Sequence, residues 1–118
     1  MIKFENGYVL GKDFELIKDD VYVKGDSIYK IGKCDEKADS VYDLNGNLLM
    51  PSFKNAHTHS AMTFGRSLAD DLPLQSWLNN EIFPREAKLE SQDIYDLSML
   101  AFLEYLTSGI SACFDMYY

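Results

Sequence analysis

The stretch from Pro51 to His59 constrains this chain more than any other feature. Residues 51–57 have the composition of a strand, with proline at the first position, where no ladder hydrogen bond is needed. His57 and His59 are the only histidines in the chain and stand one residue apart. Because strand side chains alternate between faces, both imidazoles are predicted to point to one side and to converge on one ion. The alternative is a pair of solvated surface histidines.

The segment after His59 predicts a crossover containing helices. Residues 60–71 read as a loop with short helical turns, and residues 74–82 as a short helix. This helix carries one apolar stripe, made by Leu74, Trp77, Leu78 and Ile82. We expect Trp77 to anchor it in a core. Asp70 and Asp71 are expected to form a turn and a helix start, and not a metal-binding pair.

A longer helix follows a bridging segment at residues 84–89. Ser91 is its predicted N-cap, Asp93 lies in its first turn, and Gly109 ends it. Apolar residues cover most of its circumference, which predicts burial on several sides. Residues 110–116 form a second strand, so strand, helices and strand predict a parallel βαβ unit. Asp115, at the end of that strand, either faces the site or caps the following turn.

Residues 1–50 have the pattern of a small antiparallel β unit. Asn6-Gly7 separates two short extended pieces, and residues 21–24 and 27–32 flank a Gly-containing turn, which predicts a hairpin. Residues 40–44 and 48–50 bracket a second tight turn at Asn45-Gly46-Asn47. A few short hairpins are only marginally stable alone, so we expect them to pack on another part of the protein.

Composition excludes several partners. The 118 residues include 11 basic and 19 acidic ones, for a net charge of −8, with no basic stripe. Neither nucleic acid nor an anionic membrane suits such a surface. Cys34 and Cys113 match no metal or redox spacing and are expected to be reduced thiols. The sequence has no signal-peptide pattern and no membrane-spanning stretch, so we predict a cytoplasmic protein.

Two histidines supply only part of a catalytic zinc site, which normally has three protein ligands and a water. The sequence contains neither an HExxH motif nor the Pro-Cys-x-x-Cys signature of cytidine-type deaminases. A parallel sheet also needs more than two strands. We therefore expect the chain to be the N-terminal part of a larger protein, with the remaining ligands beyond residue 118.

Residues 43–59, DLNGNLLMPSFKNAHTH, resemble the entry to the barrel of the amidohydrolase superfamily. Residues 60–78, which contain Ala-Asp-Asp-Leu-Pro-Leu, resemble its 5-methylthioadenosine/S-adenosylhomocysteine deaminase branch, near the chlorohydrolase and guanine deaminase groups. Residues 82–89 and 107–117 continue the likeness over nearly the whole chain. Ser52 and Lys54 depart from it, since the family usually has glycine and a small apolar residue there.

This resemblance implies an α/β fold: the first part of a (β/α)8 barrel in residues 51–118, preceded by a small β domain in residues 1–50. It also implies metal-dependent hydrolytic deamination of adenosine-type nucleosides in the full-length protein. His57 and His59 would bind one divalent ion, expected to be zinc. Glu86 resembles the carboxylate that holds the ribose hydroxyls, although spacing alone favours an ordinary exposed glutamate paired with Lys88 or Arg85. No acid or base catalyst is expected within these 118 residues.

Two other interpretations remain open at this stage. Within the family, the protein could be a guanine deaminase or a chlorohydrolase-like enzyme. From another class, it could be a non-catalytic module that acts as a binding or assembly surface. We expect the 118-residue chain alone to be inactive and to oligomerise or self-associate through exposed barrel edges.

Overall fold

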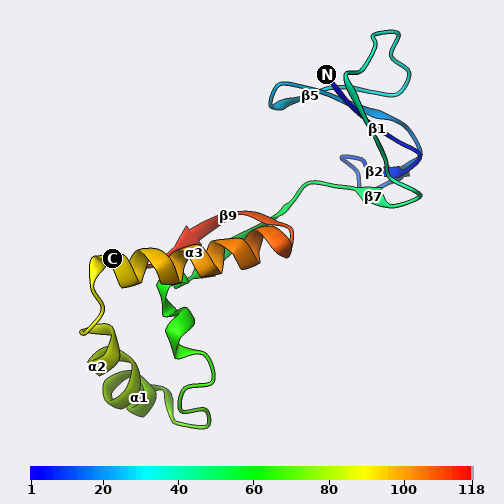
Figure 1. Cartoon of the computed structure of the whole chain (residues 1–118). Coiled ribbons are helices and arrows are strands. Elements are labelled where there is room, and N and C mark those ends of the chain that lie inside the picture. The colour runs from blue at the N-terminus through cyan, green and yellow to red at the C-terminus, as the bar shows by residue number, and fades with distance from the viewer. Residues whose placement is uncertain (118) are drawn as a thin grey trace. The chain divides into compact units, whose positions relative to one another are not determined.

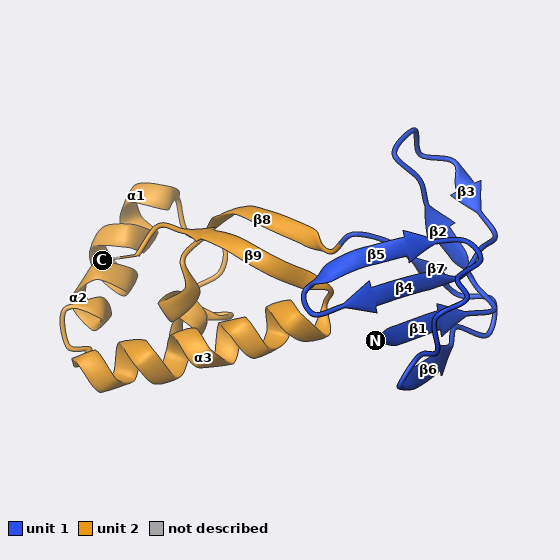
Figure 2. Ribbon diagram, turned by 90° about the horizontal axis from the view of Figure 1, so that it is seen from above, with its two compact units in different colours: residues 1–51 blue, residues 52–118 orange. Residues whose placement is uncertain are grey.

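The computed structural model describes residues 1–117 and separates into two compact units, Met1–Pro51 and Ser52–Tyr118 (Figures 1 and 2). The first unit contains only strands: β1 (Ile2–Glu5), β2 (Tyr8–Leu10), β3 (Leu16–Ile17), β4 (Val21–Lys24), β5 (Ser27–Ile31), β6 (Ser40–Asp43) and β7 (Leu48–Leu49). The second unit contains β8 (Phe53–Thr58), η1 (Ser60–Gly65), α1 (Leu74–Trp77), η2 (Leu78–Ile82), α2 (Phe83–Glu86), α3 (Ser91–Thr107) and β9 (Ile110–Asp115).

The first unit forms two small sheets, with strand orders β5-β4-β1-β6 and β3-β2-β7. The predicted hairpin of β4 and β5 is confirmed: the two strands pair antiparallel, and Gly25 turns between them with a φ of +64°. Val9, Val21 and Tyr22 are buried and form the centre of this unit. Lys3 lies between the carboxylates of Glu5 and Asp20, which hold its pKa above the usual lysine value.

The prediction of a wholly antiparallel first unit is wrong. β1 pairs parallel with β6, and β2 pairs parallel with β7. Each expected turn carries the chain from one sheet into the other, so β1–β2 and β6–β7 are two bent arms that lie side by side. The bends are joined by hydrogen bonds from the Gly46 N–H to the Asn6 carbonyl (2.7 Å) and from the Tyr8 N–H to the Asn47 carbonyl (3.0 Å).

Gly7 permits the close approach of these two arms. A Cβ atom at this position would lie 2.6 Å from the Leu44 Cβ and 2.7 Å from the Asn47 carbonyl oxygen. Both distances are shorter than van der Waals contact, so no larger residue fits without displacing the neighbouring arm. Here glycine is required by packing, and not by a special backbone angle.

The second unit contains the predicted parallel βαβ arrangement. β8 and β9 pair parallel, and α3 runs along this pair (Figure 2). The C-terminal end of the described chain lies beside α1 and α2, so these helices are at the carboxyl ends of both strands. Residues 60–65 form the short 3₁₀ helix η1, in agreement with the predicted short helical turns.

The helix expected over residues 74–82 extends further than predicted. α1, the π-helical turn η2 and α2 follow one another without a break from Leu74 to Glu86, so residues 84–86 are helical and not a bridge. Pro84 is accommodated because it lies in the first turn of α2, where a backbone N–H is not needed. Ile82 is completely buried and fixes this stretch to the rest of the unit.

The long helix α3 confirms the predicted element but corrects two details. Its N-cap is Glu90 and not Ser91, because the Asp93 carboxylate accepts a hydrogen bond from the Glu90 N–H (2.8 Å). At the other end Gly109 turns the chain with a φ of +76°. Ala101 is the only buried residue of this helix, since α3 packs by one side against η1 and β9. The prediction of burial on several sides is therefore wrong for this chain.

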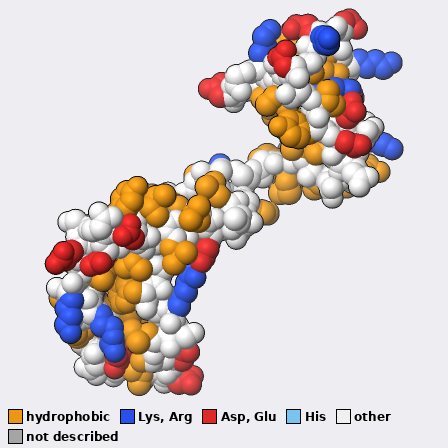
Figure 3. Space-filling model, in the orientation of Figure 1, with side chains coloured by type: hydrophobic (Ala, Val, Ile, Leu, Met, Phe, Trp, Pro, Cys, Tyr) orange, Lys and Arg blue, Asp and Glu red, His pale blue; other side chains and the backbone are white. Residues whose placement is uncertain are grey.

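Large apolar side chains are exposed on both units, as the orange surface in Figure 3 shows. Within residues 1–117 no helix is both long and apolar enough to cross a membrane. Cys34 and Cys113 are free thiols, as the sequence predicted.

Candidate functional site

The carboxyl end of β8 brings the two histidines together. His57 is the second-to-last residue of β8, and His59 directly follows the strand. Their rings meet edge to face, with centroids 5.1 Å apart and planes at 89°. Both side chains are exposed. This geometry agrees with the same-side arrangement expected from strand alternation.

A backbone carbonyl orients the His59 ring. Its Nδ1 lies 2.9 Å from the Met116 carbonyl oxygen, just past the end of β9. A carbonyl oxygen can only accept, so Nδ1 carries the proton in this hydrogen bond. The neutral ring then presents the lone pair of Nε2, which is the atom free to bind a metal. A hydrogen bond of this kind is the usual way in which proteins orient a metal-binding imidazole.

Two further hydrogen bonds join the ends of β8 and β9. The Met116 N–H donates to the Thr58 carbonyl (2.8 Å), and the Ser60 N–H donates to the Asp115 carboxylate (3.1 Å). Asp115, whose role the sequence left open, thus accepts a hydrogen bond at the start of η1. Together these contacts fix the backbone on both sides of His59.

Glu86 and His59 line the same cavity, which has a volume of about 360 Å³. The cavity lies at the carboxyl ends of the strands, and its other walls are apolar side chains of α1, η2 and α2, Met62 and residues 116–117. Arg85 pairs with Glu81 (2.5 Å), so it is not the partner of Glu86. An apolar cavity of this size with a few convergent polar groups is typical of small-molecule sites. Trp77, predicted to be a core anchor, is half-buried in its wall and donates its indole N–H to the Leu68 carbonyl (3.2 Å).

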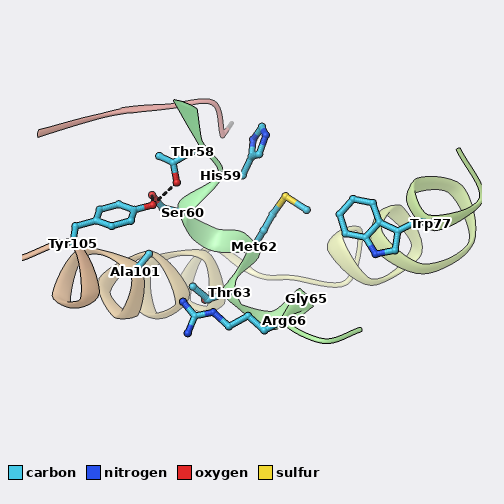
Figure 4. A pocket seen from close by; sticks show the side chains of 10 residues that line it. All are labelled: Thr58, His59, Ser60, Met62, Thr63, Gly65, Arg66, Trp77, Ala101 and Tyr105. Carbon is cyan, nitrogen blue, oxygen red and sulfur yellow. Dashed lines mark hydrogen bonds between the residues drawn. The ribbon is translucent and has the colours of Figure 1, made fainter. Parts of the chain in front are cut away.

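A second cavity of about 360 Å³, also lined by His59, has walls from η1, α3 and Trp77 of α1 (Figure 4). Its polar lining includes the hydroxyls of Thr58, Ser60 and Tyr105. Arg66, at its edge, binds both carboxylate oxygens of Glu104 at 2.6 and 2.5 Å. These hydrogen bonds lower the pKa of the Glu104 carboxyl and raise that of the Arg66 guanidinium.

No sequence pattern predicts the contacts of Tyr105. This residue belongs to the apolar face of α3 by its spacing, and its hydroxyl meets residues that are 45 and 47 positions earlier in the chain. Only the three-dimensional arrangement of η1 and α3 brings these groups together.

The residues present fit part of a zinc site. Two imidazoles meet at the end of a strand, and one of them has a fixed tautomer. Within residues 1–117 no group of three or more histidine, cysteine, aspartate or glutamate side chains is arranged to hold an ion. A catalytic zinc ion normally has three protein ligands, so these two imidazoles could provide only part of such a set.

The sequence is similar to a known protein family and to several curated members of it. Residues 48–118 match the Amidohydrolase family. The chain is 43% identical, over 119 residues, to a 5-methylthioadenosine/S-adenosylhomocysteine deaminase of Thermococcus sibiricus, covering 99% of this chain and 28% of that protein. A 5'-deoxyadenosine deaminase of Methanosarcina mazei is 43% identical over 121 residues, with the same two coverages. The chain thus spans about 28% of the length of these curated relatives.

Solved structures give the same fold. The crystal structure of an adenosine deaminase from Xanthomonas campestris with bound zinc matches with a TM-score of 0.79 and 27% identity, covering 99% of this chain and 29% of that one. A prolidase structure matches with a TM-score of 0.69 at 19% identity, covering 97% and 25%. The second likeness concerns the fold alone.

Proposed function

The chain belongs to the amidohydrolase family, and from this membership we propose that the full-length protein is a metal-dependent aminohydrolase of adenosine-type nucleosides. The proposed substrates are 5-methylthioadenosine and S-adenosylhomocysteine. Water replaces the amino group of the adenine ring, the ring carbon gains an oxygen, and ammonia is released. The observation that carries the proposal is the pair of histidine rings at the end of β8, with the His59 tautomer fixed by Met116.

His57 and His59 are the proposed metal ligands of this part of the protein. The donor set favours zinc, since neutral imidazole nitrogens suit this ion. When bound, the ion supplies a Lewis acid that lowers the pKa of water to about 7 and so activates it near neutral pH. The contribution of this chain is to hold two ring nitrogens at one place before the ion binds. His59 needs no reorientation, because the Met116 carbonyl already fixes its ring.

Glu86 is the proposed binding group for the ribose. A carboxylate accepts hydrogen bonds from both hydroxyls of a vicinal diol, which distinguishes a nucleoside from a free base. Two observations support this role: Glu86 shares a cavity with His59, and Arg85 is engaged with Glu81.

The two compact units have different proposed roles. Residues 51–118 are the first strands and helices of a (β/α)8 barrel, whose catalytic groups gather at the carboxyl ends of its strands. Residues 1–50 belong to a small β domain outside the barrel. The free thiols of Cys34 and Cys113 suit the reducing cytoplasm, which is the proposed location.

The proposal is tested with the full-length protein by metal analysis and by a substrate panel. We expect about one zinc or other divalent ion per chain, and ammonia release from 5-methylthioadenosine and S-adenosylhomocysteine. The double variant His57→Ala/His59→Ala should lose both the metal and the activity, whereas Lys54→Gln, on the same strand, should keep both. Absence of stoichiometric metal would overturn the proposal. Activity confined to guanine or to chlorinated triazines would replace the nucleoside assignment with another amidohydrolase reaction.

A further inference from the structure

Three hydroxyl groups connect α3 to the residues on either side of His59. The Tyr105 hydroxyl, which projects from α3, is hydrogen-bonded to the Thr58 hydroxyl, and it lies 3.3 Å from the Ser60 hydroxyl (Figure 4). Thr58 and Ser60 are the immediate neighbours of His59 in the chain. One phenol group thus holds the chain both before and after this histidine.

The three residues of this hydroxyl cluster are buried or half-buried. Ser60 is 1% exposed, so water competes poorly for its hydrogen bond, and Thr58 and Tyr105 are half-buried. Ala101, one helical turn before Tyr105, is 3% exposed, and its small side chain allows η1 to lie close to α3. Thr63 adds a hydrogen bond from η1 to the Leu97 carbonyl of α3 (3.1 Å). The tyrosine is therefore held on a rigid helix that is itself fixed against η1.

We propose that Tyr105 is a positioning residue for His59, an inference that rests on the proposed role of His59 as a metal ligand. The ring of His59 is oriented by the Met116 carbonyl, and its backbone is held by the hydroxyl cluster. Loss of the phenol oxygen removes the side-chain hydrogen bonds of Thr58 and Ser60 and leaves only their backbone bonds to Met116 and Asp115, so the imidazole nitrogen occupies its binding position for less of the time. Tyr105 touches neither substrate nor metal in this arrangement.

A purely structural tyrosine would behave differently. The Tyr105 ring also packs near Phe102, with centroids 6.1 Å apart, and this contact does not involve the hydroxyl. A phenylalanine at position 105 keeps the packing and removes only the hydrogen bonds. Tyr105→Phe therefore separates the positioning role from the contribution of the ring to the stability of α3.

The experiment compares Tyr105→Phe with Tyr95→Phe in the full-length protein. Tyr95 lies on the same helix and is 61% exposed, so the control makes the same chemical change away from His59. Zinc affinity is measured by chelator competition, site geometry by the absorption spectrum of the Co²⁺-loaded protein, and stability by thermal unfolding of the metal-free protein. We expect Tyr105→Phe to weaken zinc binding about tenfold and to alter the Co²⁺ spectrum, as loss of an indirect support for a ligand does. Tyr95→Phe should leave both unchanged.

Thr58→Val provides a second variant that removes the partner hydroxyl. It should weaken zinc binding similarly, and the double variant should lose little more than Tyr105→Phe alone, because both changes break one connection. If the wild-type protein binds no stoichiometric zinc, the proposed function itself fails. If the wild type binds zinc and Tyr105→Phe retains its affinity and Co²⁺ spectrum, or only unfolds at a lower temperature without metal, the positioning role is wrong.

Discussion

At the scale of single residues, the side chains of the candidate site come from different elements and are positioned by different interactions. His59 is fixed by a ring hydrogen bond to Met116, whereas Glu86 ends a helical stretch and reaches the same cavity from another element. A ligand would lie in a cavity lined by both an imidazole and a carboxylate. The proposed ribose contact can therefore be separated experimentally from the metal.

Glu86→Gln is expected to reduce kcat/KM for nucleosides in the full-length protein while metal content stays unchanged. Hydrogen bonds to a charged group contribute about 1.5–3 kcal/mol, which corresponds to a loss of roughly 10- to 160-fold. The activity on the free base should change little. Asp96→Asn, a carboxylate-to-amide change on α3 outside the cavity, is the control. Equal preference for nucleoside over base in wild type and Glu86→Gln would refute the ribose role.

The sequence predicted the placement of the two histidines but not the contacts made by the residues around them. The same-side placement of His57 and His59 follows from strand alternation, which is a local property. The bonds of Asp115 to Ser60 and of Tyr105 to Thr58 depend on the register of β8 with β9 and on the approach of α3 to η1. Such contacts join residues far apart in the chain, and no local pattern encodes them.

At the scale of elements, the two bent arms of the first unit depend on close backbone packing at Gly7. The backbone angle of this residue lies outside the left-handed region, so its glycine is needed for space alone. A substitution of Gly7 therefore tests the parallel pairing between β1–β2 and β6–β7 directly.

Gly7→Ala is expected to lower the free energy of unfolding by about 1–3 kcal/mol, the usual effect of forcing an extra carbon into a packed site. The added Cβ meets the Asn47 backbone oxygen, which cannot move without losing its hydrogen bond from the Tyr8 N–H. Gly11→Ala is the matched control, because a Cβ there meets only the flexible carboxylate end of Glu15. Chemical denaturation of the full-length protein measures both. Equal stability of the two variants would argue against the close packing of the arms.

The elements themselves were partly predictable. The β4–β5 hairpin and α3 follow from turn residues and apolar spacing, and both are present. The parallel pairing of β1 with β6 was missed because a short turn between two strands normally signals a hairpin, whereas here the turns connect two sheets. The predicted N-cap, Ser91, is one residue too late, because the Asp93 carboxylate accepts its hydrogen bond from the backbone N–H of Glu90.

At the scale of the whole molecule, the predicted family membership and the α/β fold of part of an amidohydrolase are confirmed. Many large apolar side chains of this chain are nevertheless exposed, including Leu106 on α3 (67%) and Phe114 on β9 (69%). Soluble proteins rarely leave contiguous apolar surface of this kind uncovered. The parallel pair β8–β9 also has two free edges within residues 1–117.

The 118-residue chain expressed alone is therefore expected to self-associate. Its net charge of −8 slows this association at low salt and less so at high salt, where the repulsion is screened. Size-exclusion chromatography with light scattering, at low and high salt, gives the mass directly, and the full-length protein in the same buffers is the control. A monodisperse monomer at both salt concentrations would contradict the expectation.

The parallel arms also set an order of events during synthesis. The first ten residues leave the ribosome early, but the strands that pair with them in parallel, β6 and β7, are made some forty positions later. Until then the nascent chain can complete only its antiparallel ladders with β3 and β4. A translational pause before residue 40 would hold the polypeptide with one side of β1 and β2 unpaired, and chaperones that recognise unpaired strands would have their longest access to it at that moment.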